Sequence, residues 1–382
     1  MSVQTQVSLR TWLLGSAFFG SAILLACGGD APPAKIPDQR PPPVISVPQL
    51  VDAGASTADQ APPTPALTPP TTLATRQGTI TSIVADGQWL YWLTDDGDVK
   101  RVHTAGGPAS AVTSLGPTSD DLLCVQAGTV YAATTDPKSK ATKILRANAD
   151  LSNKPDVIGT ATGALMSLTA DKSRLVWSVF DKKKLTFFVL ENGQKTARKL
   201  PAFEATTPGQ HVILGATTAT FFDAGAVKSI ALANGKVTPV ITLAEGQLVT
   251  EIVIAGDHVL AAYWDVDKTD PNKKTTNILS APLAGGASTA VLSNGQHNVF
   301  DMVADGSNIY WADNDATAKA DTASGRVMRL PITTSTPGNT PTLIADHQMF
   351  PDAIALDDDS VYWANENLSS ASLDSEVMKL AK

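Results

Sequence analysis

The chain has few cysteines and few charged side chains. It has 382 residues with two cysteines, and 17% of its residues are Asp, Glu, Lys or Arg, against about 25% in an average soluble domain. Cys124 lies in the apolar run Leu122–Val125, so we expect a buried residue without a disulfide partner. The net charge of −8 and the absence of a basic patch argue against a nucleic-acid partner.

The N-terminal segment has the features of a secretory signal. Arg10 precedes an apolar run from Trp12 to Leu25, and about fourteen apolar residues are too few for a membrane span but suit a signal peptide. The run ends in Leu24-Leu25-Ala26-Cys27-Gly28, which resembles the lipobox of bacterial lipoproteins. The resemblance implies cleavage after residue 26 and lipidation of Cys27. An ordinary secretory signal with a chance cysteine is the alternative.

The residue after Cys27 refines the predicted location. In bacterial lipoproteins an Asp at this position retains the protein in the inner membrane, and this chain has Gly28. The resemblance therefore implies an outer-membrane lipoprotein that faces the periplasm or the cell surface. Several acyl chains anchor a protein stably, so the membrane is the first expected partner.

Residues 27–71 are predicted to be a tether. Twelve of the 25 prolines lie between Gly28 and Thr71. A segment rich in proline and poor in aromatic residues cannot bury a core, which favours extended or disordered chain. Such a tether would separate the rest of the protein from the membrane.

Residues 72–382 contain seven copies of one pattern, in which an apolar strand, an Asp/Gly turn and an aromatic-rich strand follow each other. The clearest copies are Ile83–Trp92, Met302–Trp311 and Ile354–Trp363. A period of about 40–50 residues with only strand signals is typical of β-propeller blades. The sequence therefore predicts an all-β, seven-bladed β-propeller. The last copy stops after its third strand, so we expect residues near 71–76 to complete blade 7 and close the ring.

Aligning the copies gives one anchor residue per blade. The anchors are Trp92, Ala132, Trp177, Phe222, Ala262, Trp311 and Trp363. A Trp that recurs at one place in several blades is expected to pack between neighbouring sheets. The recurring Asp86, Asp305 and Asp357 are expected to accept backbone hydrogen bonds in tight turns.

The Tyr-Trp pairs at Tyr91-Trp92, Tyr310-Trp311 and Tyr362-Trp363 resemble the YWTD-type repeats of secreted and lipid-anchored propellers. The strict motif continues Thr-Asp after Tyr-Trp, whereas Leu93-Thr94 follow the first pair here. YWTD propellers have six blades, so a six-bladed ring is the alternative to the seven repeats counted in this sequence.

Blades 5 to 7 contain the long polar loops between second and third strands, and in a propeller these loops share a face with the connections between blades. Loops on a rigid scaffold are where binding usually occurs. The candidate ligand-binding residues in this sector are Trp264, Gln296, His297, Phe300, Asn314, His347, Gln348, Phe350 and Asn365. Phe300 and Phe350 are either exposed anchors for a partner or core residues, and the sequence leaves both interpretations open.

The same loops contain aspartates whose oxygen atoms suit Ca²⁺. These weak candidates are Asp265, Asp267, Asp270, Asp313 and Asp315. Neither run matches an EF-hand loop, because the required Gly and the terminal Glu are absent. The prediction is solvated acidic loops with no metal and no cofactor.

The predicted function is a non-enzymatic, lipid-anchored module that binds a protein, peptide or glycan at the bacterial cell envelope. No Gly-x-Ser-x-Gly elbow and no His-Glu-x-x-His motif occurs in the sequence. A lactonase-like enzyme would need acidic or amide ligands on the inner strands, and these strands appear mostly apolar. A metal-dependent hydrolase or lactonase-like propeller is the alternative.

Overall fold

The chain forms a ring of antiparallel sheets. The computed structural model describes residues 67–115, 122–136, 138–139, 141–150, 154–266, 274–295, 298–314, 323–332, 341–367 and 374–382. In these ranges every regular element is a strand, and no helix long and apolar enough to cross a membrane is present. Residues Leu67–Lys382 form one compact unit.

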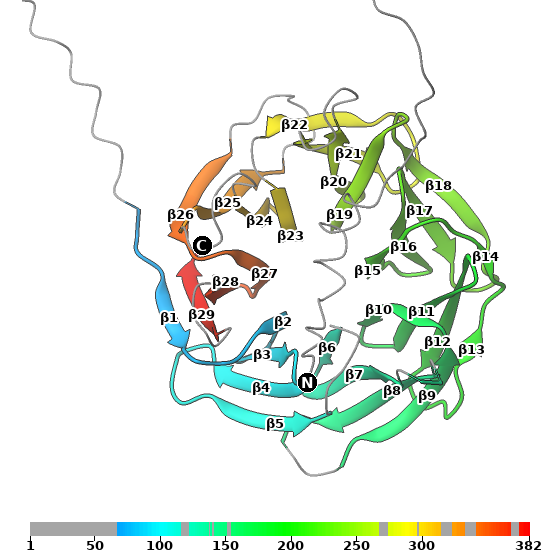
Figure 1. Cartoon of the computed structure of the whole chain (residues 1–382). Helices are drawn as coiled ribbons and strands as arrows, with labels where there is room; N and C mark the ends of the chain where they lie inside the picture. Colours follow the sequence, from blue (N-terminus) through cyan, green and yellow to red (C-terminus); the bar gives the residue numbers. More distant parts are fainter. Residues whose placement is uncertain are drawn as a thin grey trace, which may run out of the picture. The chain divides into compact units, whose positions relative to one another are not determined.

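Each blade is one sheet whose strands follow the chain outward from the centre of the ring (Figure 1). Blade 1 contains β2 (Ile80–Asp86), β3 (Trp89–Thr94), β4 (Asp98–His103) and β5 (Ser110–Ser114). Blade 2 contains β6 (Leu123–Gln126), β7 (Thr129–Thr135), β8 (Ala141–Asn148) and β9 (Asp156–Thr162). Blade 3 contains β10 (Ala164–Ala170), β11 (Arg174–Asp181), β12 (Lys184–Glu191) and two short outer strands, β13 (Arg198–Lys199) and β14 (Phe203–Glu204).

The second half of the ring repeats this order. Blade 4 contains β15 (Pro208–Leu214), β16 (Thr218–Asp223), β17 (Ala226–Ala231) and β18 (Val237–Thr242). Blade 5 contains β19 (Gln247–Ala255), β20 (His258–Val266), β21 (Lys274–Pro282) and β22 (Thr289–Gly295). Blade 6 contains β23 (Asn298–Ala304), β24 (Asn308–Asn314), β25 (Gly325–Pro331) and β26 (Thr342–Gln348). Blade 7 contains β27 (Pro351–Leu356), β28 (Ser360–Asn367), β29 (Asp374–Ala381) and β1 (Thr71–Ala74).

Blade 7 combines the two ends of the propeller. β1 pairs antiparallel with β29, with Thr71 opposite Lys379 and Thr72 opposite Met378. The pairing gives the last sheet its fourth strand and joins the first described strand to the last (Figure 1). The predicted seven-bladed ring and its closure by residues near 71–76 are therefore confirmed, and the six-bladed alternative is wrong.

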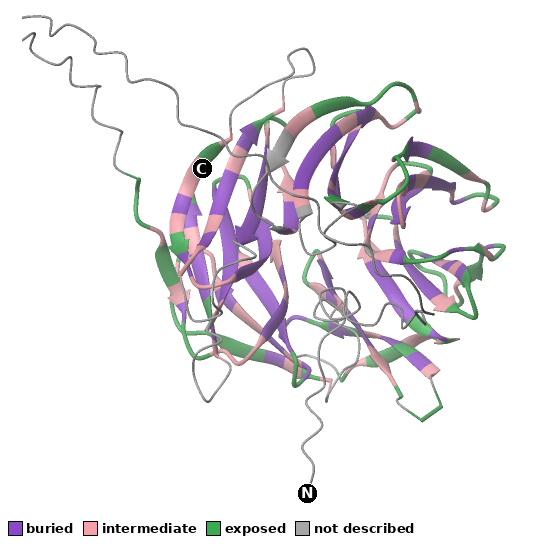
Figure 2. Ribbon diagram, turned by 45° about the horizontal axis from the view of Figure 1, so that its top comes forward, coloured by how far each residue is buried: buried purple, intermediate pink, exposed green. Residues whose placement is uncertain are grey.

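The core consists of walls between neighbouring blades. Trp311 packs with Leu260 and Ala262 of blade 5, whereas its neighbour Tyr310 packs with Trp363 of blade 7. Because side chains alternate along a strand, each second strand contributes to the wall on both of its sides. Figure 2 shows these walls as buried stretches along the strands.

Two predicted anchors are shifted by one residue. Phe222 packs with Val259 of blade 5, but the Trp position of a blade faces the preceding blade. Phe221 meets that condition, because it packs with Val176 of blade 3. In blade 5 the equivalent residue is likewise Ala261 and not Ala262, since Ala261 lies in the wall shared with blade 4.

The recurring aspartates hold turns, as predicted. Asp305 accepts hydrogen bonds from the backbone N–H groups of Ser307 and Asn308, both at 2.8 Å. Asp357 does the same for the turn before β28. Asp86 differs, because its carboxylate accepts the N–H groups of Ala127 and Gly128 in the next blade.

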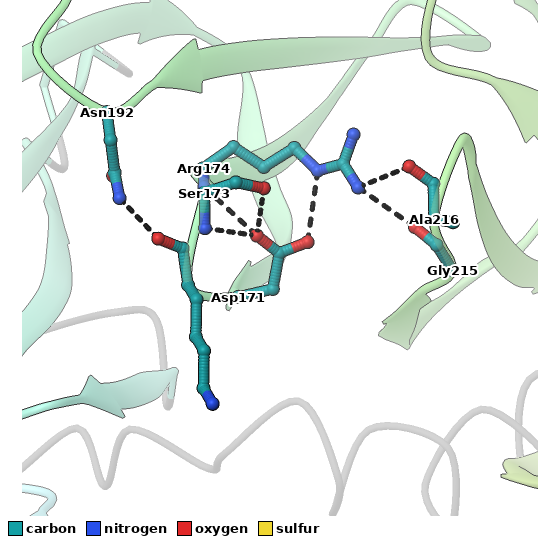
Figure 3. Close-up of polar contacts among 7 residues, drawn as sticks. Asp171, Ser173, Arg174, Asn192, Gly215 and Ala216 are labelled. Carbon is teal, nitrogen blue, oxygen red and sulfur yellow. Dashed lines mark hydrogen bonds and ion pairs between the residues drawn. The ribbon is translucent and has the colours of Figure 1, made fainter.

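Blade 3 uses its turn aspartate to fasten a neighbouring blade. Asp171 accepts hydrogen bonds from Ser173 and from Arg174 Nε, and Arg174 Nη2 donates to the carbonyl oxygens of Gly215 and Ala216 in blade 4 (Figure 3). This network at the rim is structural and leaves no polar group of Asp171 for other chemistry.

Cys124 is buried in the wall between blades 2 and 3. Burial raises the pKa of its thiol to about 12, which keeps the sulfur protonated and unreactive. The prediction of a buried structural cysteine is confirmed.

Candidate functional site

One position recurs in or directly before the innermost strand of every blade, ten residues before the anchor. In blades 1, 3, 5, 6 and 7 it directly follows a shift in the pairing register between the first and second strands. Such a shift marks a β-bulge, a device that redirects side chains at functional sites. The position is occupied by Ser82, Leu122, Ser167, His211, Glu251, Asp301 and Ala353.

Three consecutive blades carry titratable residues at this position. His211 lies on β15, Glu251 on β19 and Asp301 on β23, and these three innermost strands lie side by side around the centre of the ring (Figure 1). One nitrogen or oxygen atom of each residue lies within 4.8 Å of the corresponding atoms of the other two. Equivalent positions on adjacent blades therefore converge into one cluster.

Backbone amides orient the two carboxylates. Glu251 Oε1 accepts the N–H of Ile252 at 2.7 Å, and His211 Nδ1 lies 2.5 Å from the same oxygen. Asp301 Oδ1 accepts the N–H of Met302 at 2.8 Å, and Oδ2 accepts the N–H of Ile354 in blade 7 at 3.0 Å. Both acids are thus held in place by the residue that follows them, a local pattern shared by two blades.

The surroundings of Glu251 disfavour its ionised form. Its side chain is 4% exposed, and burial raises its pKa above the ordinary value, with His211 opposing the rise and the nearby Asp301 adding to it. Asp301 is also buried, whereas the side chain of His211 is 32% exposed. Two buried carboxylates therefore share one histidine as their described counter-charge.

The sequence analysis missed this cluster, although the repeats contain the signal for it. The inner strands were interpreted as mostly apolar. Counting ten residues back from Phe222 and Ala262 reaches Val212 and Ile252, which are apolar. Counting from the correct anchors reaches His211 and Glu251, so the shift of one residue hid the pattern.

The predicted binding sector places two aromatic rings together. Phe300 of β23 and Phe350, just before β27, have ring centroids 5.2 Å apart at an interplanar angle of 49°. Both side chains are half-buried, and neither belongs to the inter-blade core clusters of the described residues. Phe300 occupies the bulge, where Thr81 and Thr250 in other blades donate a hydrogen bond to the second strand.

The connection that carries Phe350 has an unusual backbone. His347 and Phe350 have φ angles of 56° and 45°, in the left-handed region that disfavours residues with a side chain. His347 is exposed, and its Nδ1 lies 3.3 Å from a carboxylate oxygen of Asp346. Unfavourable backbone conformations are enriched at functional sites, and this one presents the Phe350 ring to Phe300.

Three predicted amide residues gather at the seam between blades 6 and 7. Gln348 Oε1 accepts hydrogen bonds from Trp363 Nε1 and Asn365 Nδ2, each at 3.0 Å. Asn314 approaches Gly325, where an added Cβ would lie 2.6 Å from its Oδ1 and 2.8 Å from the Gln348 carbonyl oxygen. All three amides are buried, so they position the loops of the seam and do not form an open surface.

The remaining described candidates lie on two blades, Asp313 on β24 of blade 6 and the neighbouring Trp264 and Asp265 on β20 of blade 5. Asp313 is occupied by Arg326, whose Nε and Nη2 reach its two oxygens, and by Trp311 Nε1. Asp265 is exposed and accepts a hydrogen bond from Gln247. Trp264 is buried at the end of β20. Cys27, Gln296, His297, Asp267, Asp270 and Asp315 lie outside the described residues.

A surface hollow occurs at a different place. It is lined by Thr75, Arg76, Asp374 and Glu376, where β1 joins blade 7. None of the candidate residues lines it, so it does not alter the assignment of the site.

Comparisons with known proteins show the fold of this chain but not its function. No protein-family model matches the sequence, and no curated protein matches it. Among solved structures 1146 chains match, which shows that the fold is widespread. All those described below share 12% sequence identity or less with this chain, so they carry no information about its ligand.

Three solved structures illustrate the likeness. The β-propeller domain of the Trilobed protease from Pyrococcus furiosus, which has an open velcro topology, is 10% identical, with a TM-score of 0.56 over 81% of this chain and 96% of that chain. An acylaminoacyl peptidase is 8% identical, with a TM-score of 0.56 over 80% of this chain and 52% of that one. The computationally designed Ika8 protein is 12% identical, with a TM-score of 0.52 over 81% and 98%.

Proposed function

We propose that this chain is a non-enzymatic binding module of the bacterial cell envelope, anchored through a lipid on Cys27, whose propeller binds a polypeptide partner at Phe300 and Phe350. The paired rings carry the proposal. They form an apolar surface on two adjacent blades, next to the exposed His347.

The physical argument rests on partial burial. A half-buried aromatic ring on a rigid scaffold loses little conformational entropy on binding and offers a large apolar area. Truncation of such an anchor typically weakens a protein interface by about 2 kcal/mol or more. The buried amides of Gln348 and Asn365 fix the loop that carries Phe350, which keeps the surface preorganised.

Site-specific photo-crosslinking in intact cells tests the binding surface. A photoreactive amino acid at exposed His347 should give a discrete polypeptide adduct, and the same group at exposed Val157 of β9 serves as the matched control. The double variant Phe300→Ala and Phe350→Ala should reduce the His347 adduct at least tenfold while the protein stays folded. Equal adducts at both positions, or an adduct that survives in the folded double variant, would contradict the proposal.

The anchor has its own test. Cys27→Ser should release the protein from the membrane fraction and remove the acyl mass from the mature N-terminus. An unchanged distribution and an unchanged mass would exclude lipidation.

A metal-dependent hydrolase is the second candidate, because the structure has ligand-type side chains on the inner strands. The triad of His211, Glu251 and Asp301 resembles a three-ligand catalytic metal set in composition. A screen of purified protein with ester, lactone and phosphoester substrates, with and without Zn²⁺, distinguishes this candidate from the binding module.

A further inference from the structure

We propose that His211, Glu251 and Asp301 form a binding site for a divalent cation of the Zn²⁺ class at the centre of the ring. The proposal goes beyond the partner surface at Phe300 and Phe350 and does not depend on it. It rests on the convergence of three donor atoms within 4.8 Å of one another and on the way in which each residue is held.

The three donor side chains come from equivalent positions of neighbouring blades. Glu251 and Asp301 directly follow the register shift of their innermost strands, and His211 lies at the end of the irregular stretch between Pro208 and Val212 of β15. Rigid strands with shared geometry hold ligands more accurately than loops do. The blades with Ser82, Leu122, Ser167 or Ala353 at this point are closed and packed in the same way, so the ring does not require charged residues there.

The two carboxylate oxygens of Glu251 differ in their contacts. Both described contacts of the Glu251 carboxylate, from Ile252 and His211, are made to Oε1. Within the described residues no donor reaches Oε2, although the residue as a whole is only 3% exposed. Oε2 is not one of the fully enclosed atoms that lack a partner, so a cation can reach it.

The charges of the two carboxylates also favour a bound cation. Two buried carboxylates lie near one histidine, and like charges at such distances in a buried site destabilise each other. A divalent cation balances both acids. The hydrogen bonds from Met302 and Ile354 to Asp301 then act as the outer contacts that orient a metal ligand.

The donor set selects the kind of cation. Ca²⁺ and Mg²⁺ prefer oxygen ligands only, whereas a histidine nitrogen with two carboxylates suits Zn²⁺ and its spectroscopic substitute Co²⁺. Tetrahedral Zn²⁺ with bonds of about 2.1 Å places its ligand atoms about 3.4 Å apart. The donor atoms lie within 4.8 Å of one another, so small side-chain shifts must bring them to this spacing, and the 32% exposure of the His211 side chain gives it room to move. Three protein ligands leave one position for water or a ligand group.

Calorimetric titration of the purified, EDTA-treated full chain with ZnCl₂ tests the site. We expect one site per chain, and His211→Gln and Glu251→Gln should each lower its affinity at least about 100-fold. His211→Gln is the primary variant, because its partly exposed side chain makes a folding defect unexpected. His258→Gln is the matched control, since His258 also contacts a carboxylate, that of Asp257, at 2.7 Å, and should leave the affinity within twofold of the unmutated chain.

A second readout keeps the test independent of folding defects. Co²⁺ bound to the unmutated chain should show the intense visible absorption of a four-coordinate site, and ZnCl₂ should displace it, whereas CaCl₂ in excess should not. No binding, or an affinity that His211→Gln leaves unchanged and His258→Gln lowers, would overturn the proposal.

Discussion

The seven blades differ most at one position of their innermost strands. In blades 1, 2, 3 and 7 that position is neutral, and in blade 3 it is a buried Ser167 whose hydroxyl pairs with that of Ser178 at 2.7 Å. In blades 4, 5 and 6 it carries His211, Glu251 and Asp301. The walls between blades are packed alike on both sides of the ring.

The contrast distinguishes the residues that stabilise the ring from the residues that the ring can present to a ligand. Packing of large apolar side chains between sheets supplies stability in every blade. A buried acid supplies none by itself and is unfavourable unless it is paired. The neutral blades show that the fold is satisfied without charge at this position, which is why three adjacent charged residues indicate function.

The largest expected effect comes from breaking a wall and leaving the cluster intact. Trp363 is fully buried between blades 6 and 7, and Trp363→Ala should lower the free energy of unfolding by about 3–5 kcal/mol. Chemical denaturation measures this loss. The folded variant should keep the Zn²⁺ affinity of the unmutated chain, and a parallel loss of affinity would show that wall and cluster are not separable.

The next effect comes from placing a charge in a neutral blade. Ser167→Asp should destabilise the protein by about 3 kcal/mol, because Ser167 is 1% exposed and a buried charge without a partner is strongly unfavourable. Ser167→Ala is the control and should lose about 1 kcal/mol, the contribution of one hydrogen bond. If Ser167→Asp is as stable as the control, the position tolerates charge in any blade and the contrast loses its meaning.

A substitution inside the cluster is expected to have a smaller effect and to stabilise the protein, in contrast to the two preceding substitutions. Because burial raises the pKa of Glu251, the folded state favours the protonated acid, and its contribution to stability falls as pH rises above the ordinary glutamate pKa of about 4.3. Glu251→Gln in EDTA should therefore stabilise the protein by about 1 kcal/mol at pH 8.

The advantage of Glu251→Gln should disappear as the pH falls below about 4, because the glutamate then becomes protonated in the unfolded state as well as in the folded state. Thermal melts of the two proteins across this pH range check the sign. A variant that is less stable than the unmutated chain at pH 8 would show that the Glu251–His211 contact is a net stabilising ion pair.

The smallest effect concerns the aromatic pair. Phe350 has a φ of 45°, which glycine adopts without the penalty of about 1 kcal/mol that a side chain incurs. Phe350→Gly should therefore be more stable than Phe350→Ala by about that amount, and both should lose the His347 adduct. Denaturation of the two variants measures the difference, and equal stabilities would remove backbone strain from the account of this loop.

Much of the fold was predictable because repetition reinforces weak signals. The Tyr-Trp pairs, the turn aspartates and the unfinished last repeat led to seven blades and to closure by residues near 71–76. In blade 4 the aromatic pair is Phe221-Phe222, and either ring fits the anchor position equally well in sequence. Only the wall that each ring faces decides between them.

The candidate site was predictable in part. The contact between Phe300 and Phe350 follows from placing the loops of adjacent blades on one face, and the sequence analysis put both in one sector. The burial of Gln348 and Asn365 was not predictable, because it depends on hydrogen bonds across a seam. In the sequence, His211 and Glu251 are 40 residues apart, and Glu251 and Asp301 are 50 residues apart. Only the correct alignment of the blades shows that the three residues occupy equivalent positions.

Anomalous diffraction at the zinc absorption edge, from crystals of the chain grown with ZnCl₂, tests the central claim most directly. We expect one strong peak at the centre of the ring, about 2.0–2.2 Å from a nitrogen of His211 and from a carboxylate oxygen of each of Glu251 and Asp301. No peak between these three side chains, with zinc found only at exposed histidines such as His347, would contradict the proposal.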